Sequence, residues 1–180
     1  MKLSSKDNNI WFTSDLHFFH KRIIEFCPKT RPYNNVEEMN EAIISKWNNT
    51  VDTQDHVFIL GDVSFGKQQE TDTIIKRLNG NKFLVLGNHD KGLHTSLFSC
   101  AKDYLVAKID CIDVVMFHFP MLQWDKMHYG SYHLFGHVHG SPVGNAGRSM
   151  DVGWDVAGKL FSWEDVQNKL KDLPVLPHGG

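Results

Sequence analysis

The chain has 180 residues, of which 41% are hydrophobic and 22% are charged, and its formal net charge is −2. These values are typical of a globular protein of about one domain, which we expect to span residues 1–180 with a flexible tail at 174–180. The near-neutral charge argues against a non-specific binder of nucleic acid or anionic lipid. No apolar run approaches the roughly 20 residues that a bilayer span requires, so we expect no membrane association.

The cysteines and the first residues bear on the cellular compartment. Cys27, Cys100 and Cys111 form no CxxC pair, and an odd number of cysteines cannot pair completely within one chain. The first nine residues are polar and lack the apolar core of a signal peptide. We therefore expect reduced thiols and a cytoplasmic protein.

Strands and helices alternate in the first half of the chain. Apolar runs at residues 10–13, 56–60 and 82–86 predict buried strands. Apolar residues at helical spacing predict helices over residues 36–47 and 68–78. Strands that alternate with helices predict an α/β fold with a mostly parallel sheet covered by helices.

Local signals mark the ends of the helices. Asn35, with Glu38 three residues later, predicts the N-cap of the first helix, and Gly80 predicts the C-cap of the second. Ser162 and Asp165 predict the start of a short last helix.

The second half of the chain is richer in strands. Strands are predicted near residues 105–117, 132–136 and 149–161 with little helix between them, which favours a second, more antiparallel sheet packed on the first. Residues 136–153 contain five glycines and a proline, so we expect a loop there.

Five of the apolar runs are each followed by a cluster of metal-binding residue types. Strand ends in α/β sheets are where binding sites form, so these side chains are expected to meet at one edge. Imidazole, carboxylate and amide groups together suit Mn, Fe, Ni or Zn. A shared carboxylate would let the set hold two ions about 3.5–4 Å apart, as in two-metal phosphoryl transfer sites. The predicted ligands are Asp15, His17, Asp62, Asn88, His118, His137 and His139.

In this order the clusters read DxH, GD, GNHD, H and GHxH over residues 10–140, which resembles the calcineurin-like metallophosphoesterase family. The resemblance is strongest to small bacterial and phage members, whose further features are matched by His20 and by Arg31-Pro32-Tyr33. It implies a four-layer α/β/β/α sandwich of two packed mixed sheets. It also assigns one ion to Asp15, His17, Asp62 and His139, and the other to Asp62, Asn88, His118 and His137.

The resemblance makes His89 the proton donor to the leaving group. Asp90 is the next residue, and its carboxylate could orient His89 and favour the protonated imidazole. Two alternatives remain open from the residues alone. Asp90 could cap the following turn, and His89 could be a polar residue outside the site.

The second motif departs from that of protein Ser/Thr phosphatases, which read GDxxDRG. Residues 61–66 lack both the second aspartate and the arginine, so another group must hold phosphate. Arg31 is the first candidate, His20 could line the same opening, and Arg148 is the alternative. Arg31 could instead form an ion pair with the acidic face at residues 37–38.

These features predict a hydrolase for a phosphodiester or a small phosphomonoester, in which a hydroxide bridging two ions attacks phosphorus directly. Few basic groups are available to hold a dianion, which favours the diester. One alternative is a nuclease that stacks bases on Trp11, Trp124, Tyr129 and Tyr132, although the net charge disfavours nucleic acid. A non-catalytic scaffold of the same fold is the other, and the complete ligand set argues against it.

Overall fold

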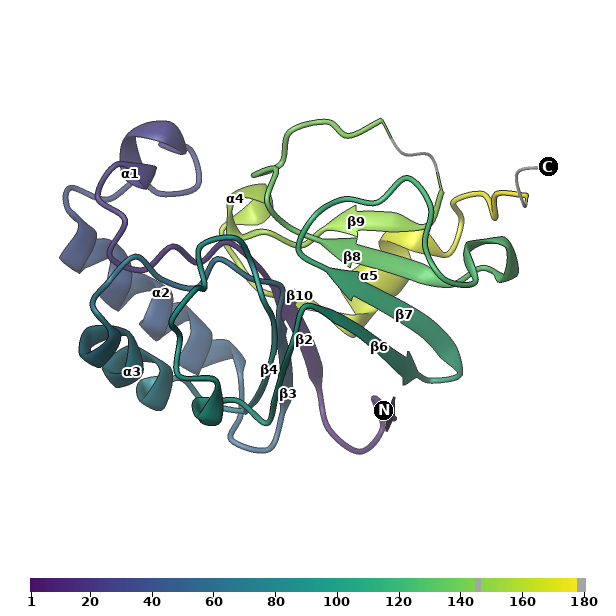
Figure 1. Cartoon of the computed structure of the whole chain (residues 1–180), viewed down its shortest axis with the longest axis horizontal. Coiled ribbons are helices and arrows are strands. Elements are labelled where there is room, and N and C mark those ends of the chain that lie inside the picture. Colours follow the sequence, from purple (N-terminus) through teal and green to yellow (C-terminus); the bar gives the residue numbers. More distant parts are fainter. Residues whose placement is uncertain (145–146, 178–180) are drawn as a thin grey trace.

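The computed structural model describes residues 1–144 and 147–177 (Figure 1). The first sheet has the strand order β10-β2-β3-β4-β5, in which β2 to β5 are parallel and β10 is antiparallel to β2. Aromatic residues of three strands face each other across it, with ring centroids 5.5 Å apart for Phe12 and Phe58 and 5.0 Å apart for Phe58 and Phe83. The strands are β2 (Ile10–Thr13), β3 (His56–Ile59), β4 (Asn81–Val85), β5 (Cys100–Lys102) and β10 (Phe161–Ser162).

The second sheet has the order β1-β6-β7-β8-β9. Of its described pairings only β6 with β7 is antiparallel, so the expectation of a more antiparallel sheet was wrong. Asp110 and Cys111 make the tight turn between these two strands with positive φ, whereas the long connection after β7 lets β8 return parallel. The strands are β1 (Lys2–Leu3), β6 (Tyr104–Ile109), β7 (Ile112–Phe117), β8 (Tyr132–Phe135) and β9 (Ser149–Asp151).

The glycine-rich stretch from 136 to 153 is not all loop, because β9 lies within it. This strand pairs with the free edge of β8, where Leu134 lies opposite Met150. Backbone groups at a sheet edge favour such pairing even where the local sequence is weak in strand formers.

The predicted helix ends are mostly confirmed. α2 (Val36–Thr50) begins after Asn35, whose side chain accepts the N–H of Glu38 at 2.8 Å. α5 (Trp163–Leu170) begins after Ser162, whose hydroxyl accepts the N–H of Asp165 at 3.0 Å. Gly80 does not cap α3 (Gln68–Arg77), because the helix ends at Arg77, three residues earlier, and its C-cap Leu78 is already extended. The remaining helices are α1 (Ile23–Phe26), α4 (Trp154–Ala157) and the 3-10 turns η1 (Thr95–Leu97) and η2 (Met127–Tyr129).

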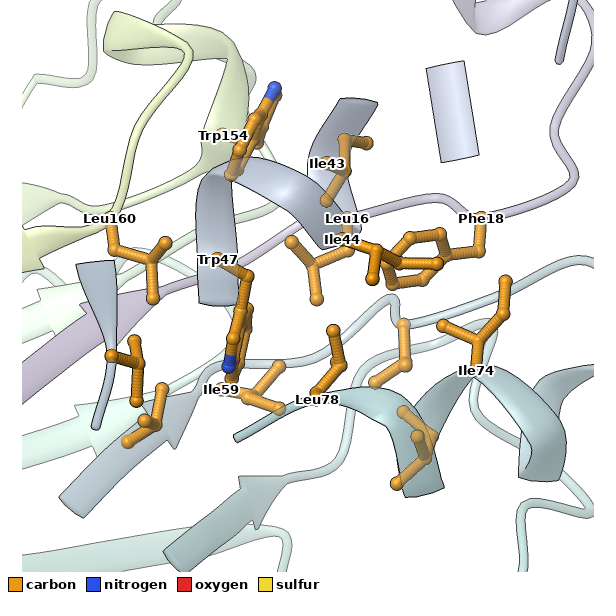
Figure 2. Packing of buried hydrophobic residues seen from close by; sticks show 14 of the residues in the cluster. Leu16, Phe18, Ile43, Ile44, Trp47, Ile59, Ile74, Leu78, Trp154 and Leu160 are labelled. Atoms are coloured by element: carbon orange, nitrogen blue, oxygen red, sulfur yellow. The ribbon is translucent and has the colours of Figure 1, made fainter. Parts of the chain in front are cut away.

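Two apolar cores follow from the alternation of side chains along the strands. Val57 and Ile59 of β3 join the core formed with α2 and α3. Figure 2 shows Ile59 beside Trp47 of α2 in this core. Phe58 of β3 faces the second sheet and joins a core that includes Met116 of β7 and residues of α5. The predicted α/β fold with two packed mixed sheets is thus confirmed.

The described part of the C-terminal tail has no regular secondary structure. Residues 178–180 of the tail predicted to be flexible lie outside the described residues, and 174–177 carry no helix or strand. Across residues 1–144 and 147–177, no helix is both long enough and apolar enough to cross a bilayer.

Candidate metal centre

The loops after five strands bring the predicted ligands together at one edge of the two sheets. The loop after β2 runs beside the loop after β3, because Asp15 N–H donates to Gly61 O at 2.9 Å and His17 N–H donates to Asp62 O at 3.1 Å. Gly61 has φ +94°, and a Cβ there would come within 2.6 Å of His118 Nδ1. Only glycine therefore lets the second loop pass this close to the ligand that follows β7.

Five of the seven predicted ligands have left-handed backbone conformations. Non-glycine residues rarely adopt positive φ, and such strain gathers at functional sites. The five ligands belong to three loops, which must all be held in this conformation by their neighbours. They are Asp15 (φ 54°), His17 (50°), Asp62 (54°), His137 (69°) and His139 (50°).

The ligand side chains form two groups. In each group, one donor atom from each of three residues lies within 4.8 Å of the others; Asp15, His17 and His139 form the first group, and Asp62, His118 and His137 form the second. Asn88 joins the second group, since its Oδ1 is 3.0 Å from His118 Nε2.

Asp62 lies between the two groups. Its Oδ1 is 3.6 Å from His118 Nε2, and its Oδ2 is 3.9 Å from His17 Nε2. The two oxygens of one carboxylate thus face different groups.

The donor atoms of the first group fit a divalent cation. Asp15 Oδ1 and both ring nitrogens of His17 are buried and have no hydrogen-bond partner in the described part of the chain. Burial raises the pKa of Asp15 and lowers the pKa of His17, because it disfavours the charged form of each. A buried carboxylate oxygen without a donor is unfavourable, and a neutral imidazole is the form that binds metal, so a cation would satisfy both.

His118 in the second group leads to the same conclusion. Its Nδ1 is 2.7 Å from the carbonyl oxygen of Leu60, while its Nε2 faces the side-chain oxygen of Asn88. A neutral imidazole carries a single N–H and can satisfy only one of these two acceptors. A cation held by Nε2 and the Asn88 oxygen would satisfy the other.

His89 lies at the rim of the two groups with a side chain that is 46% exposed. Its backbone N–H donates to Asp62 Oδ1 at 3.0 Å, and its Nε2 is 4.0 Å from Asp62 Oδ2. The ring is therefore close to the ligands while one side of it stays open to solvent.

The carboxylate of Asp90 makes different contacts from those predicted. Its buried carboxylate accepts the backbone N–H groups of Asp62, Val63 and Gly87, each at 2.8 Å. Among the described contacts, none joins this carboxylate to the His89 ring. The prediction that Asp90 orients His89 was therefore wrong. Asp90 instead holds the loops after β3 and β4 together. Burial raises its pKa, although these three hydrogen bonds oppose the shift.

Arg31 is not placed to bind phosphate. The residue is fully buried, and its guanidinium donates to Asp155 at 2.7 and 3.0 Å and to the carbonyl oxygens of Asp15 and Leu16. The prediction of a phosphate contact was therefore wrong, and so was its alternative of an ion pair with residues 37–38. The partner of Arg31 is an aspartate more than 100 residues later in the chain.

Arg148 lies at the wrong end of its sheet to bind substrate. It comes directly before β9, which is parallel to β8, whereas the ligands follow the other ends of these strands. Its Nε and Nη2 donate to the carbonyl oxygens of Leu173 and Lys171 at 3.0 and 2.8 Å. The prediction of Arg148 as the alternative phosphate-binding residue was therefore wrong, because Arg148 holds the C-terminal segment.

His20 lies beside the first ligand group, as the sequence suggested. Its ring is 5.6 Å from the ring of His17, and its Nδ1 accepts the N–H of Ile23 at 3.0 Å. Phe65, which the sequence analysis did not single out, covers this side of the site. The Phe65 side chain is exposed, and its ring lies 4.3 Å from His20 and 4.5 Å from His89.

Most of the aromatic residues suggested for base stacking are buried or hydrogen-bonded within the fold. Tyr132 and Trp124 are buried, and the indole of Trp124 donates to Ser131 O at 3.2 Å. The indole of Trp11 donates to Asp55 at 2.9 Å. Tyr129 is 81% exposed but lies in η2, within the long connection between β7 and β8.

Asp155 is the main site residue that the sequence analysis missed. Burial opposes its ionisation, but hydrogen bonds from His139 and Arg31 outweigh burial and hold its pKa below the usual range. The feature of the sequence that could have identified Asp155 is its position shortly after the last ligand pair, in the segment that forms α4.

Known proteins resemble this chain in sequence and in fold. The chain is 27% identical over 201 residues to the Gene 66 protein of Mycobacterium phage L5, covering 92% of this chain and 96% of that protein. It is 44% identical over 84 residues to an uncharacterized protein of Methanocaldococcus jannaschii, although this match spans only 46% of the chain and 47% of the relative.

A protein of unknown function from Aquifex aeolicus has the same fold, with a TM-score of 0.71 and 22% identity over 91% of this chain and 100% of that one. The model of the family described as calcineurin-like phosphoesterase matches residues 9–180. With a match over most of its length, and with the motif residues gathered at one sheet edge, the chain belongs to the calcineurin-like phosphoesterase family.

Proposed function

We propose that the protein is a phosphoesterase that uses two metal ions to hydrolyse a phosphodiester. The observation that carries this proposal is the position of Asp62, whose two oxygens face separate ligand groups at 3.6 and 3.9 Å. A carboxylate placed in this way suits two ions held side by side. Membership in a family of phosphoesterases supports the hydrolytic reaction.

In the proposed centre each ion has its own group of donors. Asp15, His17 and His139 would hold the first, His118, His137 and Asn88 the second, and Asp62 both. When bound, the ions would lower the pKa of water and neutralise charge that develops on the phosphoryl oxygens. Mn, Fe, Ni and Zn all suit this mixture of nitrogen and oxygen donors.

His89 is the proton donor of the proposed reaction. The hydrogen bond from its backbone to Asp62 fixes its position, while its half-exposed ring can reach a leaving oxygen at the rim. As an imidazolium it would hydrogen-bond that oxygen and protonate the alkoxide as the bond to phosphorus breaks. His20 lies on the same side and could contact the phosphoryl group.

The surroundings of the site favour a diester over a monoester. Neither Arg31 nor Arg148 can supply the positive charge that a dianionic monoester would call for, because both are bound to other groups. A diester carries a single negative charge. The exposed ring of Phe65, next to His89, offers an apolar surface for an organic leaving group.

The test is a hydrolysis panel on protein that has been freed of metal and then loaded with Mn, Ni, Zn or Mg. The substrates are an aryl phosphodiester, an aryl phosphomonoester, 2′,3′- and 3′,5′-cyclic nucleotides, and single-stranded nucleic acid. We expect metal-dependent turnover, with the aryl diester cleaved faster than the monoester. Faster cleavage of the monoester would contradict the diester assignment, and preferred cleavage of nucleic acid would favour the nuclease.

Metal content tests the two-ion arrangement separately. Asp62→Asn should lose bound metal and turnover more severely than Asp15→Asn or His118→Ala, because Asp62 contacts both groups. Asp103→Asn, at an exposed position, is the matched control. An Asp62→Asn protein with two ions and wild-type turnover would refute the proposal.

A further inference from the structure

A buried arginine–aspartate pair lies directly behind the first ligand group. The side chains of Arg31 and Asp155 are 0% and 1% exposed, and the Nε of Arg31 is 2.7 Å from Asp155 Oδ1. Arg31 also donates to the carbonyl oxygen of Asp15 at 2.6 Å and to that of Leu16 at 2.9 Å. The guanidinium therefore joins Asp155 to the backbone that carries the predicted ligand Asp15.

Asp155 extends this contact to a second ligand. Its Oδ2 is 2.7 Å from His139 Nδ1, and its Oδ1 accepts the hydroxyl of Thr30 at 2.9 Å. A carboxylate paired with a guanidinium is ionised and can only accept, so Nδ1 of His139 carries the imidazole proton. In the neutral ring that a metal requires, the lone pair is then on Nε2, which faces Asp15 Oδ1 at 3.9 Å.

The same residues could be read as a third cation site, because donor atoms of Cys27, His139 and Asp155 lie within 4.8 Å of one another. Arg31 argues against this reading. Its guanidinium already donates to both oxygens of Asp155, and its positive charge would repel a cation placed there. Burial also raises the pKa of the Cys27 thiol to about 11, which disfavours the thiolate that a metal requires.

We infer that Arg31 and Asp155 are positioning residues, which hold His139 in the Nδ1–H tautomer and direct its Nε2 toward an ion bound beside Asp15. The inference rests on the proposed two-metal function and adds to it the residues that orient the first group. Carboxylates that hold a metal-binding histidine in this way typically change metal affinity by roughly 10- to 100-fold. Arg31 keeps Asp155 in place and ties it to the Asp15 backbone.

The tautomer of His139 can be measured in the absence of metal and without mutating Arg31 or Asp155. Two-bond ¹H–¹⁵N NMR spectra of metal-free protein with ¹⁵N-labelled histidine distinguish a protonated Nδ1 from a protonated Nε2. Comparison with the His139→Gln spectrum identifies the His139 signals. We expect Nδ1–H for His139 in the wild-type protein. An Nε2–H tautomer would overturn the inference, whether or not any variant folds.

Metal titration tests the consequence for binding. Mn²⁺ is titrated into metal-free wild type and Asp155→Asn, and calorimetry measures the affinity for each ion. We expect one of the two ions to bind Asp155→Asn roughly 10- to 100-fold more weakly, and the other to bind nearly as in wild type. Asp165→Asn is the matched control, because it neutralises a carboxylate that accepts the N–H of Ser162 at the start of α5 and leaves the His139 contact intact.

The outcomes separate this inference from the proposed function. If wild type binds no Mn²⁺, the proposed function fails, and the NMR result still decides the tautomer. If wild type and Asp155→Asn both bind two ions with equal affinity, the positioning role is refuted and the two-metal centre stands. An equal loss of affinity in Asp165→Asn would assign the effect to lowered stability and would also refute the positioning role.

Discussion

Replacing Asp90 with asparagine tests how the loops of the metal centre are held. The Oδ2 of Asp90 accepts two N–H groups, from Asp62 and Gly87, and its Oδ1 accepts one, from Val63. Asparagine has one side-chain oxygen, which can keep the first two contacts while its NH₂ group faces the N–H of Val63. One hydrogen bond to a charged acceptor is then lost and one buried donor is left unpaired, which should lower the free energy of unfolding by about 2–4 kcal/mol.

Urea unfolding of metal-free Asp90→Asn measures this loss, with His89→Gln and the double variant as controls. Because the carboxylate contacts backbone and not the His89 ring, the loss should be the same in both backgrounds. Mn²⁺ affinity should fall as well, since the loop of Asp62 is one of those released. A loss below about 0.5 kcal/mol, or one that disappears in the His89→Gln background, would refute the reasoning and restore Asp90 as the partner of His89.

Three further predictions concern His89, Gly87 and the buried His133. His89→Ala should keep its metal but lose roughly 10²–10⁴ in kcat for alkoxide leaving groups and less for nitrophenolate, which departs without a proton; equal losses would remove His89 from the acid role. Gly87→Ala should lose bound metal, measured by elemental analysis, because a Cβ there would overlap Asp62 Oδ1. Burial lowers the pKa of His133 to about 4, so its contribution to stability is fully present above the unfolded pKa of about 6.5 and is lost as pH falls toward 4. The difference between urea curves of wild type and His133→Gln should therefore shrink by about 3 kcal/mol over that range, and a flat difference would contradict the assignment.

Local pattern in the sequence was enough for the strands whose ends carry the predicted ligands. Buried strands read as short apolar runs, and a capped helix start requires only residues three apart, as at Asn35 and Glu38. The five clusters at strand ends could be assigned to one edge because parallel strands point the same way. Their order along the chain carried the family resemblance, which the family match over residues 9–180 confirms.

The roles of the charged residues around the site were decided only by the tertiary structure. Arg31 precedes a proline in a loop near the first ligands, and by sequence alone it looked free to bind phosphate. Its partner Asp155 is 124 residues away, and chain folding buries both beside His139. Asp90 likewise binds backbone groups that lie up to 28 residues earlier instead of its neighbour in sequence.

The sequence by itself therefore determined which side chains can bind metal and at which edge of the sheets they gather, because these depend on residue type and local periodicity. Only the tertiary structure decided that Arg31 supports a ligand loop instead of contacting phosphate, and that Asp90 binds backbone groups instead of the His89 ring. The physical reason is that a buried charge must be paired, and the group that pairs it is chosen by packing between distant segments of the chain.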